Sequence, residues 1–122
     1  MLFFTGVIAV SATDYKLYNG YSNEFWGLGL EDDDFYLRIR RRNVTIVRPQ
    51  LPVEYLKYKT VYQDPIEPNP DRQNVFDSGY MRFETDGLVN LKFNLTDFKL
   101  QPQYTHLIVH LWNNVKDNNV IA

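Results

Sequence analysis

The sequence predicts an all-β protein, built as an antiparallel β-sandwich. Aromatic residues make up 16% of the chain, including nine Tyr and eight Phe, and flat side chains of this kind suit the half-buried surface of a sheet. Several short runs alternate between apolar and polar side chains, which is the period of a strand. A chain of 122 residues has the usual size of one domain. Residues 1–122 are therefore predicted to form a single β-sandwich domain.

The first part of the chain is expected to supply strands and tight turns. Residues 1–12 are an apolar stretch that is either a first strand or the remnant of a signal peptide. Residues 35–40 alternate in a period of two and predict a strand, which an acidic turn at 31–34 precedes. The chain is then expected to reverse into a further strand at 44–47.

Prolines mark the boundaries in the middle of the chain. The alternating stretch 53–62 predicts another strand. Pro65, Pro68 and Pro70 follow it closely, and proline cannot donate to a β-ladder. The sequence therefore predicts a long Pro-rich loop at 64–74 within the one domain.

The last third of the chain predicts a β-hairpin and a long strand. Residues 80–84 and 88–95 flank Asp86-Gly87, a pair that tolerates the positive φ angles of a type I′ hairpin turn. Residues 103–112 alternate next, with both faces largely apolar or amphipathic. Such a pattern is typical of a central strand that is covered on each side.

Three residues before that strand carry a resemblance to a known fold. Leu100, Pro102 and Tyr104 resemble the tyrosine-corner pattern of fibronectin type III and immunoglobulin-like sandwiches. The resemblance implies an immunoglobulin-like sandwich, with a jelly-roll-like sandwich as the alternative. The Tyr- and Asn-rich, cysteine-free composition is also similar to that of small sandwiches in phage tail and baseplate proteins.

Composition and spacing exclude several kinds of chemistry. A formal charge of -2 argues against nucleic acid as a partner, and no stretch is apolar enough for a membrane span. There are no cysteines, and His106 and His110 on one strand would lie about 13 Å apart, too far to share a metal. The run Glu31–Asp34 lacks the spacing of an EF-hand loop and favours a solvated turn. We therefore predict no enzyme, no catalytic, cofactor-binding or metal residue, and no cofactor.

The favoured function is a non-enzymatic structural or adhesion module of a larger homo- or hetero-oligomeric assembly. A viral or phage particle, or another extracellular surface, is its predicted location. The alternative is a carbohydrate-binding module that holds a glycan on surface Trp and Tyr side chains. An enzyme whose carboxylates the fold gathers from distant strands remains a third hypothesis. The residues predicted to contact a ligand or partner are Trp26, Tyr36, Arg38, Arg40, Tyr62, Trp112 and Asn113.

Overall fold

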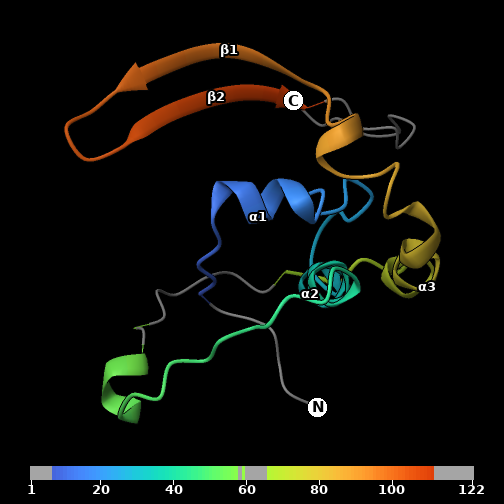
Figure 1. Ribbon diagram of the computed structural model, residues 1–122. Coiled ribbons are helices and arrows are strands. Elements are labelled where there is room, and N and C mark those ends of the chain that lie inside the picture. Colours follow the sequence, from blue (N-terminus) through green and yellow to red (C-terminus); the bar gives the residue numbers. More distant parts are fainter. Residues whose placement is uncertain (1–6, 58, 60–65, 112–122) are drawn as a thin grey trace. The chain divides into compact units, whose positions relative to one another are not determined.

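The protein combines helices with one small sheet, so the prediction of an all-β sandwich is wrong. The computed structural model describes residues 7–57, 59 and 66–111 (Figure 1). These residues fall into two compact units, which are described separately below. The chain passes from the first unit to the second between Val89 and Asn90. The elements are α1 (Ala12–Leu17), α2 (Glu31–Arg41), the 3₁₀ helix η1 (Val53–Leu56), α3 (Arg72–Arg82), the 3₁₀ helix η2 (Leu88–Asn90), β1 (Phe93–Leu100) and β2 (Thr105–Leu111).

Helix α2 replaces both the acidic turn predicted at 31–34 and the strand predicted at 35–40. Its first turn is entirely acidic and its last turn is rich in arginine, which matches the partial charges at the two ends of a helix. Leu30 precedes the helix in the left-handed conformation, at φ 69°. Phe35 and Ile39 are four residues apart and both buried, so they lie on one helix face. The same two positions also fit a period of two, which misled the strand prediction.

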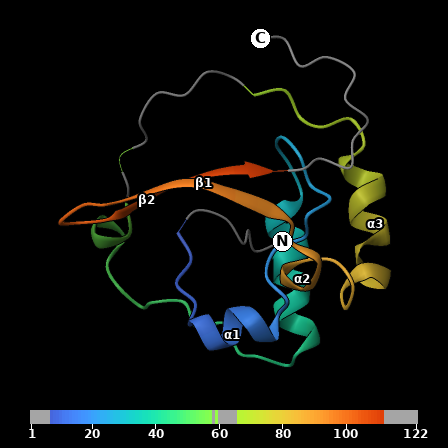
Figure 2. The same ribbon diagram turned by 90° about the horizontal axis from the view of Figure 1, so that it is seen from above.

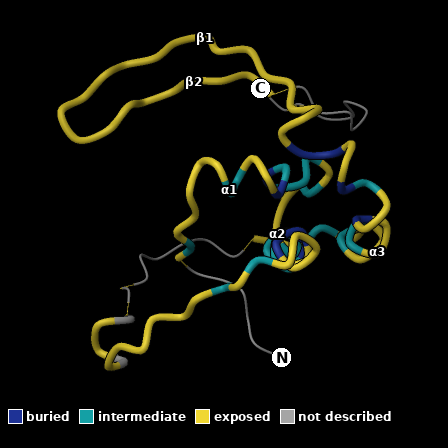
Figure 3. The backbone as a smooth tube through the Cα atoms, viewed as in Figure 1, coloured by how far each residue is buried: buried dark blue, intermediate teal, exposed yellow. Residues whose placement is uncertain are grey.

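The hydrophobic core of the first unit forms around α2. Tyr18, Phe35 and Ile39 are buried together, and Phe35 is completely inaccessible to solvent. The ring of Tyr21 stacks on Phe35 with centroids 4.1 Å apart. Figures 1 and 2 both show α2 between α1 and α3, and Figure 3 shows that burial concentrates on α2 and the loops next to it. The core therefore fixes the orientation of α2 and of the side chains at its start.

Helix α3 occupies two segments that were predicted otherwise. It begins at Arg72, so the last three residues of the predicted loop 64–74 are helical. It also includes Tyr80, where the first strand of the predicted hairpin should start. Gly79 is the buried residue of this helix, and a Cβ at that position would collide with Asp34 Oδ1 of α2. A side-chain-free position in α3 therefore allows the two helices to approach closely.

The second unit is an antiparallel hairpin, but its turn is not at Asp86-Gly87. Strands β1 and β2 pair from Phe93 with Leu111 to Leu100 with Thr105, and an irregularity lies between Leu95 and Asp97. The prediction of a strand within 103–112 agrees with β2. Tyr104 O accepts a hydrogen bond from Gln101 N in the turn, so Leu100, Pro102 and Tyr104 close a hairpin and do not form a tyrosine corner.

Several predictions are corrected or remain open. Residues 44–47 are extended without a strand assignment, and the predicted strand 53–62 begins instead as η1. Tyr62, Trp112 and Asn113 lie outside the described residues, as does the start of segment 1–12. Within the described part, no helix has the length and apolar character needed to cross a membrane. The single domain stays a prediction.

Candidate functional site

The start of α2 gathers four successive carboxylates next to a glycine-containing loop. We call the loop Trp26–Leu30 and the first turn Glu31–Asp34 the acidic corner. Glu31, Asp32 and Asp33 are partly exposed, whereas Asp34 is only 4% exposed. Carboxylates at a helix N-terminus are stabilised by the helix dipole. The acidic corner therefore offers solvent-accessible anionic oxygens on a rigid element.

The loop that enters α2 has an unusual backbone, held by specific contacts. Gly27 and Gly29 have φ angles of 76° and 119°, which side chains with a Cβ rarely adopt. Gly29 N donates a 2.8 Å hydrogen bond to Glu31 Oε2, and Asn69 N donates to Leu28 O at 3.2 Å. Glu31 is therefore engaged in holding the loop, and the segment before α3 supports it from the other side.

Asp32 and Asp33 are the carboxylates of the acidic corner that remain available. The Tyr21 hydroxyl donates a 3.1 Å hydrogen bond to Asp32 Oδ1. Burial, followed by the charge of Asp32, raises the pKa of Tyr21 well above its ordinary value, so Tyr21 is a neutral donor at ordinary pH. The Asp33 side chain makes no hydrogen bond or ion pair within the described part of the chain. Asp32 is thus the oriented carboxylate and Asp33 the unoriented one.

Asp34 belongs to a buried ionic cluster, which we define as Asp34, Arg38 and Asp86. Arg38 is 2% exposed, and its Nε donates to Asp34 Oδ2 at 2.6 Å. Its Nη1 donates to Asp86 O at 2.7 Å and its Nη2 to Asp86 Oδ2 at 3.3 Å. Buried charges of this kind require such complete pairing. The ionic cluster therefore ties α2 to the turn that follows α3.

The ionic cluster also holds the loop that carries Tyr21. Asp86 Oδ1 accepts from Asn23 N at 2.8 Å, and Asp86 Oδ2 accepts from Ser22 Oγ at 2.5 Å. Arg38 Nη1 lies within 3.4 Å of Gly20 O. Contacts on both sides of Tyr21 thus fix the loop to buried charges.

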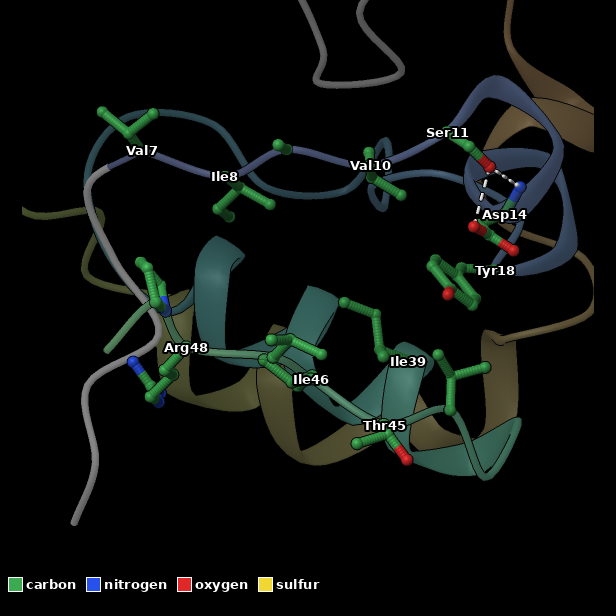
Figure 4. A pocket seen from close by; sticks show the side chains of 14 residues that line it. Val7, Ile8, Val10, Ser11, Asp14, Tyr18, Ile39, Thr45, Ile46 and Arg48 are labelled. Carbon is green, nitrogen blue, oxygen red and sulfur yellow. Dashed lines mark hydrogen bonds between the residues drawn. The ribbon is translucent and has the colours of Figure 1, made fainter. Parts of the chain in front are cut away.

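A hollow of about 350 Å³ lies elsewhere in the first unit, between two extended segments (Figure 4). Residues 7–11 form one wall and 44–49 the other, with Tyr18 and Ile39 also lining it. Most of its lining is apolar, and its carboxylate, Asp14, is bonded to Ser11. It lacks the several convergent polar groups of a catalytic pocket, so the acidic corner is the better candidate.

The structure places the predicted contact residues in different environments. Trp26 is 37% exposed in the loop of the acidic corner. Tyr36 is half-buried on α2 and packs against the core, while Arg40 is exposed in the last turn. Arg38 was expected on an outer strand face but is buried in the ionic cluster, because the segment is a helix. The predicted contacts of Trp26, Tyr36 and Arg40 with a ligand or partner stay predictions.

The residues that organise the site were missed in the sequence. Asp32 and Asp33 were assigned to a solvated turn, although an acidic turn followed by an arginine-rich stretch is a helix signature. That signal could have found α2 and its exposed carboxylates. Tyr21 and Asp86 carry no comparable local signal, since their partners lie 11 and 48 residues away.

Comparison with known proteins matches residues 2–64, just over half of the chain, to the family described as the N-terminal domain of galactosyltransferase. The chain is 34% identical over 116 residues to β-1,4-galactosyltransferase 4 of Cricetulus griseus, covering 93% of this chain and 33% of that protein. It is 31% identical over 112 residues to β-1,4-galactosyltransferase 2 of Mus musculus, covering 89% and 30%. The chain thus spans about a third of the length of these curated relatives.

Solved structures show the same likeness. A mutant of Drosophila β-1,4-galactosyltransferase 7 in complex with manganese, UDP-Gal and xylobiose superimposes with a TM-score of 0.55 at 29% identity, covering 83% of this chain and 46% of that one. The catalytic domain of the Drosophila enzyme in complex with xylobiose gives a TM-score of 0.56 at 26% identity, covering 84% and 47%.

These matches overturn the functional predictions made from the sequence. The immunoglobulin-like or phage-tail resemblance, the non-enzymatic structural or adhesion role, the carbohydrate-binding module and the virion location are all wrong, because the family and the relatives named above are galactosyltransferases. The resemblance failed because its three residues form a hairpin turn. The chain belongs to the galactosyltransferase family.

Proposed function

We propose that this chain supplies part of the catalytic site of a β-1,4-galactosyltransferase, with Asp32 as the general base. The observation that carries the proposal is the partly exposed Asp32 carboxylate, which α2 and the Tyr21 hydroxyl hold in one orientation. Family membership and the likeness to a structure bound to UDP-Gal support the choice of reaction.

The proposed reaction transfers galactose from UDP-Gal to a sugar hydroxyl, the 4-hydroxyl by the relatives' name. The acceptor oxygen forms a bond to the anomeric carbon of galactose, and the bond between that carbon and the UDP oxygen breaks. UDP leaves with the bonding electrons, and the acceptor hydroxyl proton passes to Asp32. A carboxylate within hydrogen-bond reach of the hydroxyl performs this transfer. Asp32 thus raises the nucleophilicity of the acceptor as the new bond forms.

The other carboxylates of the acidic corner suit this role less well. Asp34 is buried and paired with Arg38, and Glu31 holds Gly29 N. Asp33 is accessible but has no group that orients it among the described residues, and an effective base is normally oriented by a further group. Asp33 is therefore the natural comparison for Asp32.

Manganese is present in the Drosophila complex, so we tested whether the residues at hand could hold a metal. Within the described ranges, no three His, Cys, Asp or Glu side chains converge in a metal-binding arrangement. The acidic corner illustrates this, since Glu31 and Asp34 already serve other partners. The described residues do not fit a metal site by themselves, and no step proposed here passes through a metal.

The decisive experiment compares Asp32→Asn with Asp33→Asn in the full chain. Transfer from UDP-Gal to xylobiose and to other sugars with a free 4-hydroxyl would be measured as UDP release. Asp32→Asn is expected to lower kcat by about 10²–10⁴-fold, the usual contribution of general base catalysis, and Asp33→Asn to lower it by less than about tenfold. Full activity of Asp32→Asn in a correctly folded protein would refute the assignment.

A further inference from the structure

Tyr21 lies on a short loop that is fixed at every position around it. Gly20 N donates to Tyr15 O at 3.0 Å, and Tyr21 N donates to the Tyr15 hydroxyl at 3.4 Å. Ser22 and Asn23 bind the two carboxylate oxygens of Asp86. A loop with this many partners in the core has little freedom to move. The backbone of Tyr21 is therefore held by α1 on one side and by the ionic cluster on the other.

The side chain of Tyr21 is held equally well. Its ring is 4.1 Å from the ring of Phe35, with an interplanar angle of 12°, and it is half-buried. Only the hydroxyl reaches the acidic corner, where it donates to Asp32 Oδ1. The Tyr21 ring packs on Phe35 and the Tyr21 hydroxyl bonds to Asp32. The two parts of this side chain therefore contact α2 at positions that are three residues apart. This geometry separates the packing role of the ring from the polar role of the hydroxyl.

We propose that Tyr21 is a positioning residue of the galactosyl transfer, whose hydroxyl orients the Asp32 carboxylate for proton abstraction. The inference rests on the proposed function of Asp32. The hydrogen bond occupies Oδ1 and leaves Oδ2 for the acceptor hydroxyl, so one oxygen is used for orientation and the other for chemistry. Tyr21 itself touches no reacting atom in this arrangement.

The surroundings of the pair contain few other titratable groups. Tyr15 of α1 and Glu31 of α2 are the further groups whose charges act on Tyr21. Each of these favours a neutral Tyr21, since a second negative charge beside Asp32 and Glu31 would be repelled. The Tyr21 hydroxyl therefore keeps its proton and remains a hydrogen-bond donor to Asp32.

The test is Tyr21→Phe, which retains the ring stacked on Phe35 and removes only the hydroxyl. The kcat is expected to fall by about tenfold, as for loss of a hydrogen bond to a charged group, while KM for the acceptor stays unchanged. Tyr80→Phe is the control, since Tyr80 is 74% exposed on α3 and should have the kcat and KM of the wild type.

The outcomes separate the two proposals. An active Asp32→Asn variant would refute the proposed function and this inference together. An inactive Asp32→Asn combined with a Tyr21→Phe variant of unchanged kcat would overturn only the positioning role. A lowered kcat accompanied by a raised KM for the acceptor and a reduced urea midpoint would also overturn it, because loss of structure alone would then account for the lost activity.

Discussion

Asp32 and Asp34 lie two residues apart on α2, yet they differ in what surrounds them. Asp32 is partly exposed and accepts a hydrogen bond from a neutral phenol. Asp34 is 4% exposed, and the Arg38 guanidinium approaches it to 2.6 Å. A buried charge must be paired, so Asp34 is committed to the fold, whereas the Asp32 carboxylate remains accessible to solvent. The same chemical group is thus accessible to solvent at Asp32 and part of a buried ion pair at Asp34.

The largest expected effect on stability concerns the buried ionic cluster around Asp34. Arg38→Met leaves Asp34 buried without its cation and leaves Asp86 with its longer 3.6 Å ion pair to Arg82 Nε. The substitution is expected to lower the free energy of unfolding by about 3–5 kcal/mol. Urea unfolding followed by circular dichroism measures the loss. Leu37→Ala is the matched control, because Leu37 is the adjacent residue and is 47% exposed. A loss below about 1 kcal/mol for Arg38→Met would show that the ionic cluster is not essential to the fold.

A smaller effect is expected where α3 meets the buried carboxylate. Gly79→Ala places a Cβ against Asp34 Oδ1, and overpacking of this kind costs about 1–3 kcal/mol. The midpoint of urea unfolding should fall accordingly. Met81→Ala on the same helix is the control, since Met81 is 86% exposed and should change stability by less than about 0.5 kcal/mol. Equal midpoints for the two variants would contradict the close packing of α2 and α3.

The smallest expected effect is the loss of stability at alkaline pH that follows from ionisation of Tyr21, the partner of Asp32. Burial and Asp32 raise the pKa of Tyr21 above the ordinary 10.0, so the unfolded chain releases this proton at a lower pH than the folded chain. Stability is therefore fully present below about pH 10 and falls as the pH rises further. The urea midpoint measured at about pH 10.5 should therefore be lower than the midpoint measured at about pH 8.

Tyr21→Phe should reduce this alkaline drop, because the variant has no phenol to ionise at that position. Part of the drop should remain, since burial and Asp14 also raise the pKa of Tyr18. An equally steep loss of stability in Tyr21→Phe and wild type would show that Tyr21 does not contribute to the alkaline response.

The sequence allowed some elements to be predicted and misled on others. Strand β2 was predicted within 103–112, because its alternation is local and no helical pattern competes with it. Helix α2 was missed, because Phe35 and Ile39 satisfy both a period of two and a period of 3.6. Asp86-Gly87 was assigned to a hairpin turn, since local turn propensity does not reveal that Asp86 is buried against Arg38.

The residues of the candidate site were likewise predicted only in part from the sequence. Trp26 was recognised as an available aromatic side chain, and the carboxylates of the acidic corner were seen but assigned to a solvated turn. The role of Arg38 was misjudged, because a strand would have exposed it whereas the helix turns it into the core. The pattern of apolar residues alone did not distinguish these two orientations.

The sequence by itself determined the carboxylate run, the arginine-rich stretch after it and the apolar alternation of β2. These are properties of neighbouring residues, and local propensity and charge express them directly. Only the tertiary structure decided which carboxylate is buried and which is available. That choice depends on Arg38 meeting Asp86 and on Tyr21 meeting Asp32, contacts between distant residues that form only when the core closes around Phe35.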